Sequence, residues 1–191
     1  MHESIVLLLA WSCGAYLVGS FPSGYLIARS AGIDDITRRG SGTMGATNVA
    51  RSLGIRFFFI VFLIDACKAA ALLYCMPAYA RPLGIIMLMM GNTLSAFFSF
   101  SGGGKGVATL VGILCVLDLK LTLLFIAVWL LSLIGIRSVG IASSIALVLL
   151  VPGAFFLMPD PLVACRIMFA ALWSLYMHKK HVAVLYQRAF V

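Results

Sequence analysis

The sequence predicts an all-α polytopic membrane protein with about seven transmembrane helices, an N-terminus outside and a C-terminus in the cytoplasm. Composition is the first reason: of the 191 residues, 63% are hydrophobic and 10% are charged, and the mean hydropathy is +1.11. A soluble domain is about half apolar and about a quarter charged. Length is the second reason, because a spanning helix needs about 20 residues. Seven spans leave no room for a separate soluble domain, so residues 1–191 are expected to form a single transmembrane domain.

Seven apolar runs, separated by short polar segments, mark the predicted spans. They cover about residues 4–28, 57–74, 82–99, 107–117, 121–136, 141–158 and 162–177. The first run carries no charge from Ile5 to Ala28, and Arg29 follows it. The fourth run is short, because its eleven residues give only about 16 Å of helix. It is therefore either a partial or tilted span or the start of a broken helix.

The distribution of basic residues is the third reason for this fold class. Lys and Arg collect in cytoplasmic loops. With seven spans and an external N-terminus, the cytoplasmic side holds ten of them: Arg29, Arg38, Arg39, Arg51, Arg56, Lys105, Arg137, Lys179, Lys180 and Arg188. The other side holds Arg81 and Lys120, and an error of one span would mix the two groups. The net charge of +8 has this topological cause, and it also suits an anionic partner.

The polar stretch GSGTMGATN at 40–48 lies in the first cytoplasmic segment. Gly40, Gly42 and Gly45 match the spacing of the G-x-G-x-x-G dinucleotide fingerprint. That fingerprint needs a preceding strand and a surrounding βαβ unit, whereas apolar spans flank this stretch. Nucleotide binding is therefore not expected here.

The same stretch offers hydroxyl and amide groups from Ser41, Thr43, Thr47 and Asn48. A helix that starts near Thr47 would place Asn48 and Arg51 on one face. Asn48 is either part of that polar face or the N-cap of the helix. We interpret Arg51 as an anion ligand beside these groups.

The segment SGGGKG at 101–106 is the second glycine-rich loop on the cytoplasmic side. It departs from a Walker A motif at both ends, because Ser99 stands at the first glycine position and Gly106 follows Lys105. Successive glycines nevertheless let backbone N–H groups converge on an anion. A helix that begins near Val107 would direct its N-terminus at the same place, and Lys105 adds a positive charge. We interpret the loop as phosphate binding; the alternative is a flexible turn between helices.

Two further pairs of polar residues have helical spacing. His178 and His181 lie three residues apart near the C-terminus, and they are candidates for a metal site, for a substrate contact, or for solvated positions beside the two lysines between them. No cytoplasmic cysteine supports a metal site, so no metal is expected. Asp65 and Lys68 lie three residues apart within the second span. Ionisable residues in a span usually face the interior, which favours a structural ion pair over direct substrate contact.

The usual signatures of acyl-transfer chemistry in soluble enzymes do not occur in this sequence. There is no G-x-S-x-G nucleophile elbow, and no histidine is followed four residues later by an aspartate. No cytoplasmic carboxylate is obviously placed as a general base. Any chemistry here must therefore rely on positioning and on the stabilisation of anions.

Five segments of the chain occur together in a familiar order: GSFPSGYLIA at 19–28, GSGTMGATNVAR at 40–51, IDACKA at 64–69, GGKGVAT at 103–109 and the HKKH tail at 178–181. Over nearly its whole length the chain resembles the bacterial acyl-phosphate-dependent glycerol-3-phosphate acyltransferase family. The resemblance implies transfer of a fatty acyl group from acyl phosphate to the 1-hydroxyl of glycerol 3-phosphate, the first step of phospholipid synthesis. The products would be 1-acylglycerol 3-phosphate and inorganic phosphate. Neither coenzyme A nor another cofactor is implied, and nucleic acid is not an expected partner.

The resemblance also implies a set of site residues. Ser41 and Arg51 would belong to the acyl-phosphate and catalytic site, with Lys105 and His178 as the other catalytic residues. The expected substrate-binding residues are Gly40, Gly42, Thr43, Gly45, Thr47, Asn48, Gly103, Gly104, Gly106, Ser143, Lys179 and His181. The enzyme would lie in the bacterial cytoplasmic (inner) membrane, with its active site on the cytoplasmic face.

The chain departs from the usual pattern of the family at five positions. Thr43 stands for an asparagine, Asn92 for a histidine, Gly140 for a serine, Lys180 for an acid and His181 for an asparagine. The change to Lys180 makes the site more basic, which would favour a different phosphorylated acceptor.

Two alternative functions are weighed against the acyltransferase. A transporter of a phosphorylated solute would show inverted repeats and charges at the membrane midplane, but the sequence has no such repeat and its polar loops lie at one interface. The second alternative is a divergent inactive relative that only binds lipid phosphate. An assay of activity distinguishes this relative from the enzyme.

Overall fold

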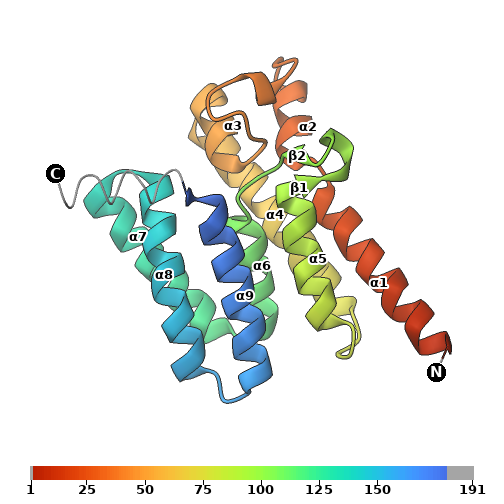
Figure 1. The fold of residues 1–191 in the computed structure, drawn as a ribbon. Helices are drawn as coiled ribbons and strands as arrows, with labels where there is room; N and C mark the ends of the chain where they lie inside the picture. Colours follow the sequence, from red (N-terminus) through yellow and green to blue (C-terminus); the bar gives the residue numbers. More distant parts are fainter. Residues whose placement is uncertain (1, 180–191) are drawn as a thin grey trace. The chain divides into compact units, whose positions relative to one another are not determined.

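The computed structural model describes residues 2–179, which fold almost entirely into helices (Figure 1). The contacts divide the chain into two compact units, one through residue 113 and the other from residue 114. We describe each unit by itself. The prediction that the chain forms a single transmembrane domain stays a prediction.

The first unit contains long helices, a polar segment with three short helices, and a small hairpin. Its elements are α1 (His2–Ser20), α2 (Ser23–Ser30), η1 (Ile36–Arg38), α3 (Ala46–Leu53), α4 (Ile55–Cys75), α5 (Arg81–Thr93), β1 (Leu94–Ser95), η2 (Ala96–Phe98) and β2 (Ser101–Gly102). Helix α6 (Val107–Leu117) runs across the division between the units. It has the bounds that the sequence predicts for the fourth span.

The first predicted span is broken near its C-terminal end, where α1 stops at Ser20 and α2 begins at Ser23. Pro22 causes the break, because proline has no N–H to continue the helical hydrogen bonds. The ammonium of Lys68 in α4 donates to the carbonyls of Gly19 and Phe21, at 3.1 and 3.0 Å. These bonds satisfy carbonyls that the end of α1 leaves without helical partners.

Helices α1 and α5 lie side by side with their backbones in close contact (Figure 1). A side chain at Gly19 would collide with the carbonyl of Leu88, and one at Gly91 would collide with the carbonyl of Tyr16. Small residues at such crossings allow helices in membranes to approach closely. This packing fixes the end of α5 beside the break between α1 and α2.

The third predicted span, about 82–99, is wrong at its C-terminal end, because α5 stops at Thr93. The chain then forms an antiparallel hairpin in which Leu94 pairs with Gly102 and Ser95 with Ser101. Polar side chains stop the helix here: the hydroxyl of Ser95 donates to the carbonyl of Ser20 at 2.9 Å. The hairpin brings the second glycine-rich loop back to the end of α5.

The second unit consists of α7 (Leu119–Ile136), α8 (Val139–Leu157) and α9 (Pro161–Met177), with α8 packed against both of the others (Figure 1). Aspartates set two of the helix starts. The carboxylate of Asp118 accepts from the amide of Leu121 at 2.6 Å, and that of Asp160 accepts from the amide of Leu162 at 2.8 Å. These are N-caps, which satisfy amides in the first turn of a helix.

The all-α fold is confirmed. Within the described part of the chain, four helical segments are long and apolar enough to cross a membrane: Ser4–Ser30, Ile55–Cys75, Leu119–Ile136 and Val139–Leu157. Val107–Leu117 and Pro161–Met177 are shorter apolar helices. The number of seven spans and their orientation stay predictions.

Candidate functional site

The polar stretch at 40–48 rests on a hydrophobic core of its own. Buried side chains of α2, η1, the loop, α3 and α4 pack together beneath it, among them Ala28, Ile36, Met44, Val49 and Val61. Because Met44 belongs to the loop and Val49 to the helix that follows, burying both fixes the loop from two directions. The loop is therefore packed as an integral part of the first unit.

The side chain of Asn48 holds the loop closed. Its Nδ2 donates to the carbonyls of Thr43 and Arg39, at 2.8 and 2.9 Å, with that of Ile36 further away at 3.3 Å. Its Oδ1 accepts from the amide of Ser41 at 2.9 Å. The alternative that Asn48 caps the helix is wrong: α3 starts at Ala46, which puts Asn48 at its third position. Asn48 is buried, and the hydrogen bonds that it makes are to the loop; its contact with substrate stays a prediction.

Two glycines of this loop serve its backbone. Gly40 and Gly42 have φ of 56° and 72°, a left-handed conformation that favours glycine. A side chain at Gly40 would also collide with Oδ1 of Asn48. These glycines allow the tight turn that presents Ser41, which is exposed, with its Oγ 3.0 Å from Oγ1 of Thr43.

The second glycine-rich loop is fitted against the end of α5. The amide of Gly104 donates to the carbonyl of Asn92 at 2.9 Å. A side chain at Gly103 would collide with the carbonyls of Asn92 and Thr93. The half-buried Lys105 and then Gly106, with φ of 84°, lead into α6. The loop thus passes directly into a helix N-terminus, as the phosphate-binding interpretation requires.

The structure brings the two loops into contact, although about 60 residues separate them. The amide of Met44 donates to the carbonyl of Gly102 at 2.8 Å. A Cβ at Gly45 would lie 3.5 Å from the Cα of Gly104. Ser41 is exposed on the first loop, and Arg51 is exposed on α3, which follows it. The first unit therefore joins the glycine backbones of the two loops, with the hydroxyl of Ser41 exposed on the first of them.

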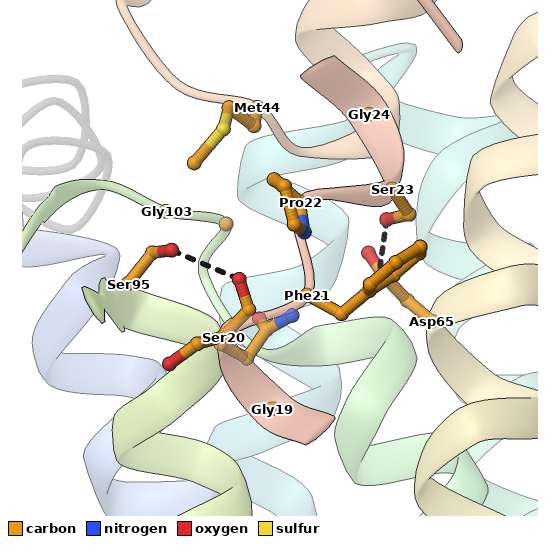
Figure 2. A pocket seen from close by; sticks show the side chains of 12 residues that line it. Gly19, Ser20, Phe21, Pro22, Ser23, Gly24, Met44, Asp65, Ser95 and Gly103 are labelled. Atoms are coloured by element: carbon orange, nitrogen blue, oxygen red, sulfur yellow. Dashed lines mark hydrogen bonds between the residues drawn. The ribbon is translucent and has the colours of Figure 1, made fainter. Parts of the chain in front are cut away.

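A small cavity of about 10 Å³ lies behind this junction (Figure 2). Side chains and backbone from α1, α2, α4, the end of α5 and the two loops line it, including Ser20, Ser23, Asp65, Asn92 and Gly103. Such a volume has room for about one water molecule, so the cavity is too small for either substrate. Apart from Gly103 and Gly104, sequence reasoning did not place these residues in the site.

Asp65 and Lys68 form the ion pair that their spacing predicts, with 2.7 Å between Nζ of Lys68 and Oδ1 of Asp65. Both side chains are almost fully buried, at 8% exposure for Asp65 and 10% for Lys68. The hydroxyl of Ser23 donates to the same carboxylate oxygen at 2.7 Å (Figure 2). The pair is therefore linked to the start of α2 as well as to the end of α1.

Four of the predicted residues lie in the second unit. His178 is buried at the end of α9, and its Nδ1 lies 2.8 Å from the carbonyl of Ser174. A carbonyl only accepts, so Nδ1 carries the proton in this hydrogen bond. The hydroxyl of Ser143 accepts from Nε1 of Trp129 at 3.0 Å. Lys179 lies over the ring of Tyr176 at 4.8 Å.

His181, together with Lys180, lies outside the described residues. The roles of the second-unit residues in the site stay predictions. Within residues 2–179, no group of three His, Cys, Asp or Glu side chains is placed to hold a metal ion.

The surface of the first loop is basic. Arg39 and Arg51 are exposed, and Arg38 pairs with Asp35 at 3.1 Å while its side chain remains 86% exposed. Hydrogen bonds from the hydroxyl and amide of Thr37, together with the charge of Arg38, hold the pKa of Asp35 below its ordinary value of 3.8. Asp35 is thus ionised at neutral pH, and the surrounding guanidinium groups give this surface a positive potential that attracts phosphate.

Comparison with known proteins places this architecture among acyltransferases. A family model described as glycerol-3-phosphate acyltransferase matches residues 9–188. A protein of that name from Synechococcus sp. (strain JA-2-3B'a(2-13)) is 40% identical over 139 residues, which are 71% of this chain and 69% of that protein. Another from Rhizobium etli (strain CIAT 652) is 31% identical over 186 residues, covering 95% of this chain and 89% of the relative.

A solved structure is similar over almost the whole chain. It is the crystal structure of PlsY (YgiH), an integral membrane glycerol 3-phosphate acyltransferase, in its glycerol 3-phosphate form. The TM-score is 0.85 at 28% identity, and the match covers 94% of this chain and 92% of the other. The lysophosphatidic acid form of the same protein gives a TM-score of 0.84.

Proposed function

The chain belongs to the glycerol-3-phosphate acyltransferase family, and on this premise we propose that it takes its acyl group from an acyl phosphate. The acceptor is the 1-hydroxyl of glycerol 3-phosphate, and the products are 1-acylglycerol 3-phosphate and inorganic phosphate. The family identity separates this function from the transporter alternative. Coenzyme A has no part in the reaction, and no cofactor or metal is required.

The observation that carries the proposal is the junction of the two glycine-rich loops. Both substrates carry phosphate. The second loop leads into the N-terminus of α6, Lys105 precedes that helix, and Arg51 is exposed on α3, the helix that follows the first loop. Amides at a helix N-terminus and positive side chains are the groups that bind phosphate in proteins. The mixed anhydride of an acyl phosphate would lie between Ser41 and Lys105, with glycerol 3-phosphate beside it.

The reaction then follows from positioning and charge. The acceptor oxygen attacks the acyl carbonyl carbon and forms the new C–O ester bond, and the bond between that carbon and the phosphate oxygen breaks. The hydroxyl proton passes to a phosphate oxygen of the donor, so the step needs no protein carboxylate as base. Ser41 and Arg51 stabilise the negative charge that develops on the carbonyl oxygen and on the leaving phosphate. Lys105 holds that phosphate in the loop, and His178 holds the acceptor.

We also propose seven spans, with the site at the cytoplasmic face of the bacterial cytoplasmic (inner) membrane. The first span comprises α1 and α2 together, and α4 to α9 supply the other six. The ten-to-two distribution of basic residues supports this orientation. Single cysteines introduced at Arg39 and at Lys120 test it with a membrane-impermeant thiol reagent in intact cells. In a background without the native cysteines, only the cysteine at position 120 should react. Labelling of the cysteine at position 39 would overturn the proposed orientation.

The function is tested with purified protein in lipid, palmitoyl phosphate and glycerol 3-phosphate. We expect release of inorganic phosphate that depends on both substrates, with no product from palmitoyl coenzyme A. Lys105→Ala should abolish turnover, whereas Lys120→Ala, an exposed lysine at the start of α7, should leave it unchanged. Release that does not need glycerol 3-phosphate would refute the proposal. No release at all would refute it and favour the inactive relative.

A further inference from the structure

We propose that the buried pair Asp65 and Lys68, together with Ser23, is a positioning element of the acyl-transfer site. These residues touch no substrate in this proposal; they act by fixing the break between α1 and α2, against which the first glycine-rich loop is seated. The inference rests on the proposed function of the two loops. It means that residues in the middle of helix α4 help to hold these loops in place.

The first link joins α4 to the end of α1. The ammonium of Lys68 makes three short contacts, with the carboxylate of Asp65 at 2.7 Å and with the carbonyls of Gly19 and Phe21 at 3.1 and 3.0 Å. An ammonium has three donors, and these three acceptors use all of them. The direction in which the chain leaves α1 is therefore set by a side chain of α4.

The second link joins the same carboxylate to the start of α2. The hydroxyl of Ser23 donates to Oδ1 of Asp65 at 2.7 Å (Figure 2). Ser23 is the first residue of α2 and is buried. Hydrogen bonds to a charged acceptor are roughly twice as strong as neutral ones, so Asp65 holds α2 firmly at the point where Pro22 has interrupted the helix.

The third link runs from α2 to both glycine-rich loops. A side chain at Gly24, next to Ser23, would collide with the carbonyl of Met44, so the backbones of α2 and the first loop are in direct contact. The amide of Met44 in turn donates to the carbonyl of Gly102 at 2.8 Å. A shift of α2 would therefore move Met44 and change the spacing between the loops.

The small cavity is bordered by Asp65 on one side and by the second glycine-rich loop on another. Asp65 and Ser23 share its wall with Gly103 and Gly104. Asp65, Ser23 and the second glycine-rich loop thus border one space with room for about one water molecule.

A simple role in folding does not account for this arrangement. Buried ion pairs are often no more stabilising than well-packed apolar side chains of similar volume, and ionisable residues inside a span are costly and usually functional. Apart from their contact with each other, the hydrogen bonds described above join Asp65 to the start of α2 and Lys68 to the end of α1. These partners are explained if the pair fixes the position of α2, against which the first glycine-rich loop packs.

Ser23→Ala is the sharpest test, because it removes the link to α2 and leaves the ion pair intact. A positioning role predicts a rise of about tenfold in the KM for glycerol 3-phosphate or for palmitoyl phosphate, with a smaller change in kcat. A purely structural role lowers the amount of folded enzyme, which reduces the maximal rate at unchanged KM. Ser30→Ala is the matched control, since Ser30 is exposed at the other end of α2 and bonds only within that helix; its KM values should stay unchanged.

The exchanged pair Asp65→Lys with Lys68→Asp gives a second, independent result. It keeps opposite charges side by side, but neither the bond from Ser23 nor the bonds to Gly19 and Phe21 can form in the same places. We expect helical content close to that of the unmodified protein and KM values still raised at least tenfold. Full recovery of KM in this variant, or unchanged KM in Ser23→Ala, would overturn the proposal.

Binding of glycerol 3-phosphate, measured by isothermal titration in the absence of a donor, separates this inference from the function itself. If the unmodified protein binds glycerol 3-phosphate and does not transfer acyl groups, the proposed reaction fails. The positioning role is then still tested by the Kd for glycerol 3-phosphate, which should be higher in Ser23→Ala than in the unmodified protein. If the unmodified protein does not bind, there is no ligand to position and the inference fails with the function.

Discussion

The side chain of Asn48 holds the first glycine-rich loop closed, and Asn48→Ala removes it. The substitution deletes three hydrogen bonds of 2.8 to 2.9 Å, two donated to Thr43 and Arg39 and one accepted from Ser41. Each net hydrogen bond contributes about 1 kcal/mol, so the ordered loop loses about 3 kcal/mol relative to an open one. At about 1.4 kcal/mol per factor of ten, kcat/KM should fall by up to about 100-fold.

The assay is phosphate release from palmitoyl phosphate, measured across glycerol 3-phosphate concentrations in purified protein. The helices should remain folded, because the lost bonds join a loop to α3 and local opening does not require global unfolding; circular dichroism checks this. Ser52→Ala on the same helix is the matched control and should behave as the unmodified enzyme. An Asn48→Ala enzyme within about threefold of the unmodified kcat/KM would show that the loop does not depend on this brace.

Three further predictions follow from other parts of the molecule. Gly103→Ala should lower kcat/KM at least tenfold and more than Gly104→Ala, because a methyl at Gly103 meets fixed backbone carbonyls whereas one at Gly104 meets a side chain at 3.2 Å; equal activities would contradict this order. Asp118→Ala should lower thermal stability by about 1 kcal/mol through the lost N-cap of α7, with KM unchanged, as thermal unfolding and kinetics together would reveal. Asp35 has a lowered pKa, so its contribution to loop stability is present above its ordinary pKa of 3.8 and is lost as the pH falls below that value; Asp35→Asn should remove this dependence in a pH series of thermal unfolding.

Local pattern was enough to predict the helices of the second unit and the two loops. Apolar runs gave the helices of the second unit to within about two residues, because hydrophobic length is a local signal. The glycine-rich loops were also recognisable, since closely spaced glycines beside Lys105 suit anion binding wherever they occur. The prediction that both loops lie at the cytoplasmic interface rests on the distribution of basic residues.

What the sequence could not supply were the contacts between distant segments. Nothing local indicates that Met44 bonds to Gly102, or that Ser95 reaches back to Ser20 and ends α5 early. Asn48 was expected to face substrate or to cap a helix, because its amide suits both. Instead it is a buried brace that donates to the carbonyls of Ile36, Arg39 and Thr43. Pro22 was the one missed local signal, since a proline inside an apolar run marks a break.

The contact between the two loops also constrains how the family can evolve. Met44 and Gly102 are joined by a hydrogen bond between backbone atoms. Substitution of the side chain of Met44 therefore does not remove this bond, whereas a change in the length of either loop does. An insertion in the hairpin before Gly103 would displace the carbonyl that receives the amide of Met44. We expect loop lengths in the two segments to change together among relatives, and sequence drift to be freest where the backbones do not meet.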